Sequence, residues 1–131
     1  MNFNLSQEDI FIPSFNKNKE LPETDQIRVL YRVPTMAIKN RCRRKPQAKA
    51  VSAKNGSIDH FEIVIEKDEL ATLNEMLISI TNCSYTYRDG KVNKITNTQS
   101  LIDAPVAFEP LYKEVVKEFD RILDETIDEK N

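Results

Sequence analysis

Glycine is scarce in this chain: there are only two among the 131 residues, Gly56 and Gly90. So few glycines exclude the glycine-rich loops that cradle phosphate groups, and they disfavour a barrel built on many tight turns. The sequence also lacks the G-x-S-x-G, Walker A and dinucleotide-binding patterns. The common signatures of hydrolases and of nucleotide-dependent enzymes are therefore missing.

Histidine and cysteine are almost as rare, with one His60 and two distant cysteines, Cys42 and Cys83. This spacing predicts two free thiols in a reducing compartment and no zinc site. The basic residues around Cys42 would lower its pKa, which raises a nucleophile hypothesis. A catalytic thiol generally needs an imidazole base, however, and His60 is the one candidate. We therefore interpret Cys42 as a small apolar residue on the inner face of a helix, and we predict no catalytic residue, no metal and no cofactor.

Long apolar runs are missing too. No stretch approaches the roughly 20 residues that a membrane-spanning helix needs. The N-terminal MNFNLSQEDIF has neither a basic segment nor an apolar core of the kind found in secretion signals. A composition of 40% hydrophobic and 31% charged residues is that of an ordinary soluble domain. We expect one cytoplasmic domain.

Charge is unevenly distributed along the chain, although the net charge is only −2. Residues 28–58 contain nine basic residues and no acid, whereas residues 103–131 contain nine acids and four bases. The basic stretch 39–54 is open to three interpretations: a solvated face, a surface for an acidic partner, or a nucleic-acid contact. The last is disfavoured, because no aromatic residues interleave with the cluster and the sequence pI is about 5.5. Opposite charges on one chain favour intramolecular pairing or head-to-tail association.

Residues 1–26 are predicted to form an extended N-terminal arm. The segment contains an apolar patch, broken by Pro13, and then a polar, turn-rich connection. Such an arm is often ordered by a partner. We predict that its apolar side chains anchor a partner, namely Ile10, Phe11, Ile12 and Phe15.

Residues 27–131 are predicted to form a single α+β domain. Period-two alternation predicts a strand over 27–33 and another over 60–66, with Glu62 and Glu66 opposite Arg28 and Arg32 if the two strands pair. Between them we expect a short basic helix that Pro46 stops, followed by a mobile basic loop over 46–58. This helix carries the candidate partner-binding residues Lys39, Arg41, Arg43, Arg44 and Lys45.

Helical spacing then predicts two more helices. The first covers 69–82, with Asp68 as its N-cap and with Leu70, Leu73, Leu77 and Ile80 in the core. The second is a long amphipathic helix over 111–127 with an acidic outer face. Between the helices, the Asp89-Gly90 pair predicts a hairpin. The predicted architecture is a small antiparallel sheet with hairpins, packed against two or three helices.

Two segments resemble a known group of proteins. ELPETDQIRVLYRVPTMAIKNRC, residues 20–42, is similar to small tailed-bacteriophage morphogenesis proteins, in which a Leu-Pro-acid element leads into a strand, then Pro-Thr, then a charged helix. Residues 73–123, with a turn region, the phrase SLIDAP and a long last helix, resemble the second half of phage tail assembly chaperones. Together these segments cover more than half of the chain.

This resemblance implies a non-enzymatic assembly factor in the host cytoplasm. Such a factor coats the tape-measure protein and helps tail-tube subunits polymerise around it. It implies those structural proteins as partners. The charge pattern adds a hypothesis of our own: the basic helix over Ile38–Lys45 and the acidic last helix are complementary surfaces, used between neighbouring copies or towards a long helical partner. Two alternatives stay open: a structural virion component, such as a connector or a minor capsid or tail protein, and a nucleic-acid-binding module that uses residues 39–54.

Overall fold

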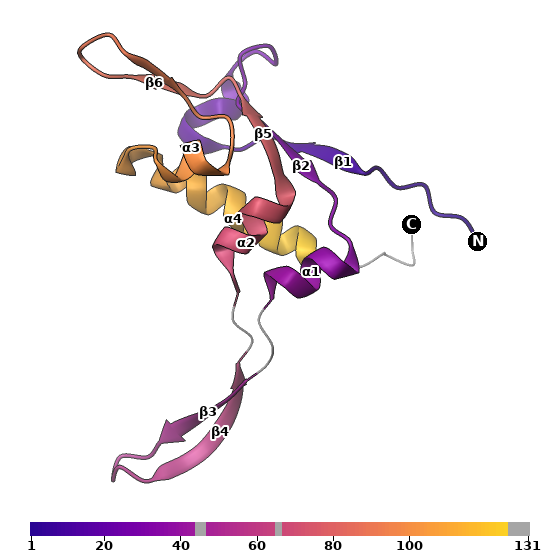
Figure 1. Cartoon of the computed structure of the whole chain (residues 1–131), viewed down its shortest axis with the longest axis vertical. Coiled ribbons are helices and arrows are strands. Elements are labelled where there is room, and N and C mark those ends of the chain that lie inside the picture. The colour runs from indigo at the N-terminus through magenta and orange to yellow at the C-terminus, as the bar shows by residue number, and fades with distance from the viewer. Residues whose placement is uncertain (44–46, 65–66, 126–131) are drawn as a thin grey trace.

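The computed structural model describes residues 1–43, 47–64 and 67–125. The chain folds into seven strands, four α-helices and two short 3-10 helices within these ranges (Figure 1). In chain order they are β1 (Glu8–Phe11), η1 (Phe15–Glu20), β2 (Arg28–Arg32), α1 (Met36–Cys42), β3 (Gln47–Ser52), β4 (Ile58–Val64), α2 (Glu69–Met76), β5 (Leu77–Thr81), β6 (Ser84–Thr86), β7 (Val92–Lys94), α3 (Thr98–Ile102), η2 (Val106–Phe108) and α4 (Glu109–Leu123).

The α+β architecture predicted from the sequence is confirmed. A three-stranded antiparallel sheet of order β1-β2-β5 lies against α4, and α2 packs on both. Alternation along β2 buries Val29 and Tyr31 while Arg28 and Arg32 stay exposed. The ring of Tyr31 lies 5.5 Å from that of Phe119 on α4. The sheet and the last helix therefore share one core.

The long helix α4 supplies the largest part of that core, and Pro110 lies in its first turn, where a missing N–H costs nothing. Its apolar stripe is wide enough to contact both the sheet and α2. The stripe consists of Leu111, Val115, Val116, Phe119, Ile122 and Leu123, all buried. The prediction of this helix is confirmed through Leu123, but α4 ends there with Asp124 as its C-cap, short of the predicted 127. Residues 126–131 lie outside the described residues.

The N-terminal segment is part of the body, which corrects the predicted arm over 1–26. β1 pairs with β2 along its whole length, and Pro13 and Asn18 are fully buried. The Asn18 side-chain amide donates to the carbonyls of Pro13 and Ile27 at 2.8 and 3.0 Å, and its oxygen accepts from the Ile27 N–H at 2.6 Å. One amide thus satisfies three backbone groups and closes the turn-rich segment onto the sheet.

The helix predicted over 69–82 ends early. Asp68 caps α2 as expected, its carboxylate accepting from the Ala71 N–H at 3.0 Å. After Met76, however, the chain continues as β5, which pairs with β2. The β-branched run of Ile78, Ile80 and Thr81 favours a strand. The predicted pairing of 27–33 with 60–66 is therefore wrong, since β2 lies between β1 and β5.

The registers of β2 give its arginines other partners than the predicted glutamates. Arg28 lies opposite Thr81, and Arg32 lies opposite Glu8. Glu62 is opposite Lys49 in the other sheet, and residue 66 lies outside the described residues.

Residues 47–64 form a separate hairpin, where we had predicted a mobile loop over 46–58. β3 and β4 pair with each other in a two-stranded sheet, and Figure 1 shows this hairpin projecting from the body. Its turn uses Gly56 at φ +83°, a conformation that favours glycine, and the Asn55 side chain accepts from the Ser57 N–H. The Asn55-Gly56 pair is the turn signal that the sequence interpretation missed.

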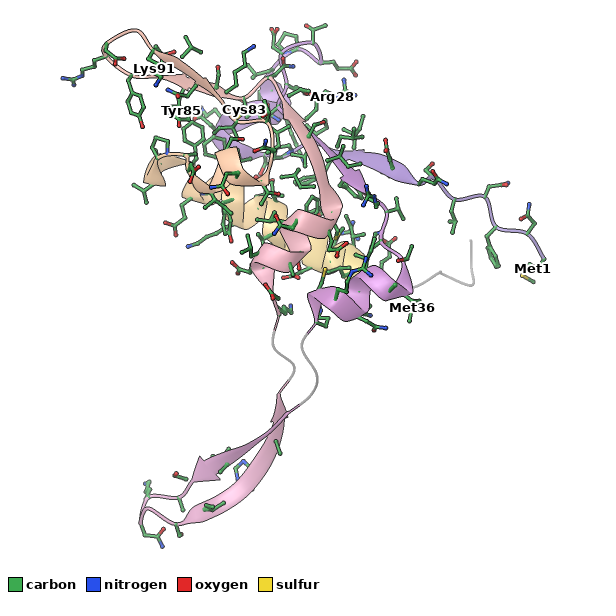
Figure 2. All side chains as sticks on the ribbon, viewed as in Figure 1. Met1, Arg28, Met36, Cys83, Tyr85 and Lys91 are labelled. Carbon is green, nitrogen blue, oxygen red and sulfur yellow. The ribbon has the colours of Figure 1, made fainter. Side chains whose placement is uncertain are left out.

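The second, smaller hairpin of β6 and β7 confirms the prediction from Asp89-Gly90. Gly90 has φ +88°, and the Asp89 carboxylate accepts from the Lys91 N–H at 2.9 Å. Lys91 lies near the outer end of this hairpin and Tyr85 nearer its base (Figure 2). The Tyr85 ring is 5.5 Å from that of Phe108, so the hairpin is held against η2.

Candidate functional site

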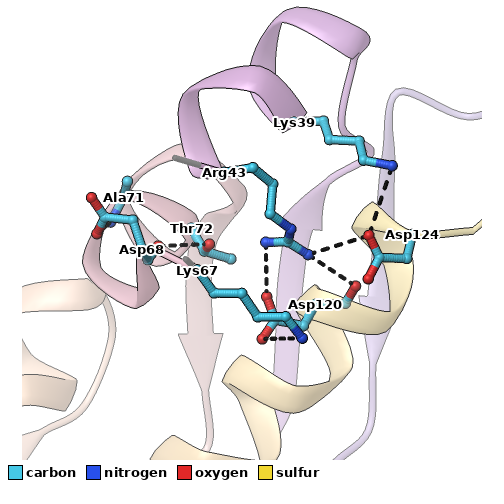
Figure 3. A network of polar contacts seen from close by, with 8 residues as sticks. All are labelled: Lys39, Arg43, Lys67, Asp68, Ala71, Thr72, Asp120 and Asp124. Carbon is cyan, nitrogen blue, oxygen red and sulfur yellow. Dashed lines mark hydrogen bonds and ion pairs between the residues drawn. The ribbon is translucent and has the colours of Figure 1, made fainter. Parts of the chain in front are cut away.

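The basic residues of α1 mostly face acids of the same chain. Arg43, which caps the C-terminal end of α1, points its guanidinium at the last turns of α4 (Figure 3). Its Nη1 lies 3.1 Å from Oδ1 of Asp120, and its Nη2 lies 3.5 Å from Oδ1 of Asp124. Lys39 reaches the same Asp124 oxygen at 3.7 Å, and Lys67 reaches Asp120 at 3.9 Å. We call these five residues the α1–α4 clasp.

Arg41 forms a second, separate ion pair with α2. Its Nε donates to Oε1 of Glu75 at 2.6 Å, and its Nη2 donates to Oε2 at 3.0 Å. This two-point hydrogen bond lowers the pKa of Glu75, with the arginine charge as a further cause. Three predicted binding residues, Lys39, Arg41 and Arg43, thus have acidic partners within the chain. The other two, Arg44 and Lys45, lie outside the described residues.

Cys42 is fully buried between α1 and α2, as the inner-face interpretation predicted. Burial raises the pKa of its thiol, and this outweighs the lowering effect of a hydrogen bond with Thr72 and of Arg43 and Arg41. The basic neighbours do lower the pKa as expected, but desolvation is the largest cause, so the expectation of a pKa below the ordinary value is wrong. Cys83 is also a free thiol, and burial raises its pKa to about 11.

The four apolar residues predicted as a partner anchor do not form one surface. Phe11 and Phe15 pack against the core, and the Phe15 ring lies 5.7 Å from that of Phe108. Ile12 is half-buried, and Ile10 is 44% exposed on β1. The two phenylalanines are thus core residues, because β1 and η1 belong to the body. A groove with several exposed apolar side chains lies elsewhere on the body.

An apolar groove lies on the body where α3, η2 and the start of α4 meet the first turn of α2. It has a volume of about 540 Å³. Three of its large apolar side chains are strongly exposed: Leu70 at 53%, Ile102 at 44% and Val106 at 81%. Its lining residues are Leu70, Leu101, Ile102, Ala104, Pro105, Val106, Phe108, Glu109 and Tyr112. Adjacent exposed apolar side chains of this kind mark an interaction surface.

Local sequence signals explain the shape of this groove. The Asn97 side chain accepts from the Ser100 N–H at 2.8 Å, and the Ser100 hydroxyl accepts from the Asn97 N–H at 2.9 Å, which starts α3 with a capping box. α3 stops at Ile102, and Pro105 directs the chain into η2. Because both turns are short, Ile102 and Val106 line the groove and stay exposed instead of entering the core.

The rim of the groove is mainly acidic. The Tyr112 hydroxyl donates to Oε2 of Glu69 at 3.0 Å, and burial followed by this hydrogen bond raises the tyrosine pKa. Glu109 forms an ion pair with Lys113 at 2.7 Å, and Asp103 is exposed directly after Ile102. The surface therefore combines an apolar floor with acidic edges, which suits an apolar partner that has basic flanks.

Sequence interpretation missed this groove. Leu70 fits the helical spacing of the core residues Leu73 and Leu77, so we assigned it to the core. Val106 precedes the α4 stripe and is out of phase with it, which is a signal that could have been noticed. Val106 and Leu70 are 36 positions apart in the sequence, and only folding brings them to the same groove.

Within residues 1–43, 47–64 and 67–125, no group of three or more His, Cys, Asp or Glu side chains is arranged to hold a metal ion. Among the helices in those ranges, none has the length and apolar character needed to traverse a bilayer. Comparison with known proteins finds no matching family model, no similar curated protein and no similar solved structure.

Proposed function

We propose that this chain is a non-enzymatic assembly factor of a tailed bacteriophage, of the tail assembly chaperone type. It acts in the host cytoplasm by binding a helical segment of the tape-measure protein and by presenting it to tail-tube subunits. The observation that carries the proposal is the exposed groove lined by Leu70, Ile102 and Val106.

The groove has the chemistry that helix-in-groove recognition uses. An amphipathic helix presents apolar anchors at positions i, i+3, i+4 and i+7, and it inserts them into a shallow apolar channel. Basic residues beside that stripe would meet Glu69, Asp103 and Glu109 at the rim. A long tape-measure helix repeats such anchors, so many copies of a small chaperone would coat it. The resemblance of residues 20–42 and 73–123 to phage morphogenesis proteins supports the same assignment.

A structural virion component is the second candidate, and the projecting β3–β4 hairpin favours it. A two-stranded hairpin is marginally stable alone in water, so a long-lived neighbour in a particle would stabilise it. Presence of the chain in purified mature particles would select this role, whereas a chaperone leaves before maturation.

The nucleic-acid alternative has less support. Lys39, Arg41 and Arg43 would have to leave their carboxylate partners before they could neutralise phosphates. A gel shift at low salt tests this role directly.

Binding calorimetry with a peptide from the tape-measure protein of the same phage tests the proposal. The wild-type chain should bind with a negative heat-capacity change, because apolar surface is buried. Val106→Asp places a charge on the groove floor, and we expect at least about 30-fold weaker binding. Val92→Asp is the matched control, because Val92 is 59% exposed on β7 and away from the groove lining. Equal binding by both variants, or no binding by the wild type, would contradict the proposal.

A further inference from the structure

Within the described residues every strand except β2 lies at a sheet edge, and two of these edge strands, β1 and β3, carry opposite charge. β1 is the outer strand of the three-stranded sheet, with β2 on its one paired side. β3 likewise has β4 on its one paired side. Each edge presents a row of backbone N–H and C=O groups that a further strand could satisfy. Both edges are accessible, since Glu8, Asp9 and Ile10 are exposed on β1, and Ala48 and Ala50 are exposed on β3.

The two edges carry opposite charge. β1 has the sequence EDIF, with two acids and no base. β3 and its turn, residues 47–57, contain Lys49 and Lys54 and no acid, and Lys54 is exposed. Contact of β1 with another β1 would gather four acids along one short pair of strands, and contact of β3 with another β3 would gather lysines. Charge therefore favours the mixed pair over either like pair.

The mixed pair does not form within one chain of this structure. β1 lies in the body sheet, whereas the β3–β4 hairpin projects away from it (Figure 1). A second copy is thus the occupant that both edges fit. The contact is heterologous, because one copy gives the hairpin and the next gives the sheet edge, so repeating it generates a ring or a filament.

We propose that the β3 edge of one copy adds to the β1 edge of the next, which extends the body sheet from three strands to five and links copies head to tail. The inference rests on the proposed function for its purpose: the head-to-tail contact would line up neighbouring chaperones along one helical partner. The main-chain hydrogen bonds give the contact, and the acidic and basic strands select its pairing.

Charge reversal tests the contact through sedimentation velocity on the full chain at low salt, about 0.02 M, and at about 0.5 M. The wild type should self-associate at low salt and dissociate partly at high salt. Variant one, Glu8→Lys/Asp9→Lys, and variant two, Lys49→Glu/Lys54→Glu, should each associate roughly tenfold or more weakly. Glu20→Lys/Glu23→Lys is the matched control, since both acids are exposed and lie outside β1.

Mixing the two variants is the decisive step. A reversed β1 then meets a reversed β3, and the two wild-type edges also meet each other, so an equimolar mixture should recover wild-type association. This recovery also shows that both variants are folded. A wild type that stays monomeric at low salt, or a mixture no better than its components, would overturn the inference. Peptide binding by monomeric wild type would leave the proposed function standing, whereas association without peptide binding would overturn that function alone.

Discussion

The α1–α4 clasp offers the sharpest test of why the basic helix is built as it is. If Arg43 and Asp120 stabilise the fold, removing them one at a time and together should show a strong coupling between them. We therefore consider Arg43→Met, Asp120→Asn and the double variant. Methionine retains an apolar stem of similar length, and asparagine retains the shape of the aspartate without its charge.

The size of the coupling follows from distance and burial. Nη1 of Arg43 lies 3.1 Å from Oδ1 of Asp120, where opposite unit charges attract by about 5 kcal/mol at an effective dielectric constant of 20. The side chains are only 11% and 17% exposed, so desolvation offsets much of this attraction. We expect a coupling of about 1.5 to 3 kcal/mol. Arg43→Met alone should cost about 2 to 4 kcal/mol, because Asp120 loses its nearest cation and, among the described residues, keeps Lys67 at 3.9 Å.

Urea denaturation of the four proteins measures this coupling, with the free energy of unfolding extrapolated to water. The Arg41–Glu75 pair is the control, since its side chains are 56% and 25% exposed. Its own cycle should give a much smaller coupling, because solvent screens this exposed pair. A coupling for Arg43 and Asp120 no larger than that of the control would refute the view that the clasp is structural. The arginine would then be free to serve a partner.

Three further predictions concern other groups. Asn18→Ala should lower the free energy of unfolding in urea by about 2 to 4 kcal/mol, because the backbone groups of Pro13 and Ile27 lose their partner; an effect below about 0.5 kcal/mol would restore the free arm. Arg41→Gln should raise the pKa of Glu75 to its ordinary range, measured by carboxyl carbon NMR, since the arginine lowers it. Because the pKa is lowered, the pair stabilises the fold fully above the ordinary carboxylate pKa, and this stabilisation is lost as the pH falls through the lowered pKa. A Glu75 titration that Arg41→Gln leaves unchanged would contradict the ion pair. Burial raises the pKa of Cys83 to about 11, so its thiol should be ionised in about one molecule in a thousand at pH 8. Alkylation of Cys83 should therefore be far slower in the folded chain than in the unfolded chain, and equal alkylation rates would contradict its burial.

Local patterns determined much of this fold. Period two gave β2, a wide apolar stripe gave α4, and the Asp68 cap and the Asp89-Gly90 turn were both readable from short stretches. β5 was not readable, because Leu77 and Ile80 also fit a helical spacing. Only pairing with β2 decides between the two structures, and that pairing depends on the tertiary fold.

The candidate site was less predictable than the fold, and for a similar reason. The basic residues of α1 appeared available for a partner, yet Arg43 pairs with an aspartate 77 positions later. The groove likewise joins Leu70 to Ile102 and Val106, which share no local pattern. Contacts of this length are set by how helices and sheet pack, so composition and periodicity carry no direct sign of them.

The central claim is that a partner helix lies in the groove, and methyl NMR tests it most directly. With the methyl groups of Leu, Ile and Val labelled, a tape-measure peptide should shift the signals of Leu70, Ile102 and Val106 and leave that of Val92 unchanged. Saturable shifts confined to the groove are the predicted result. Shifts that cluster on the β3–β4 hairpin instead, with the groove signals unmoved at saturation, would contradict the claim.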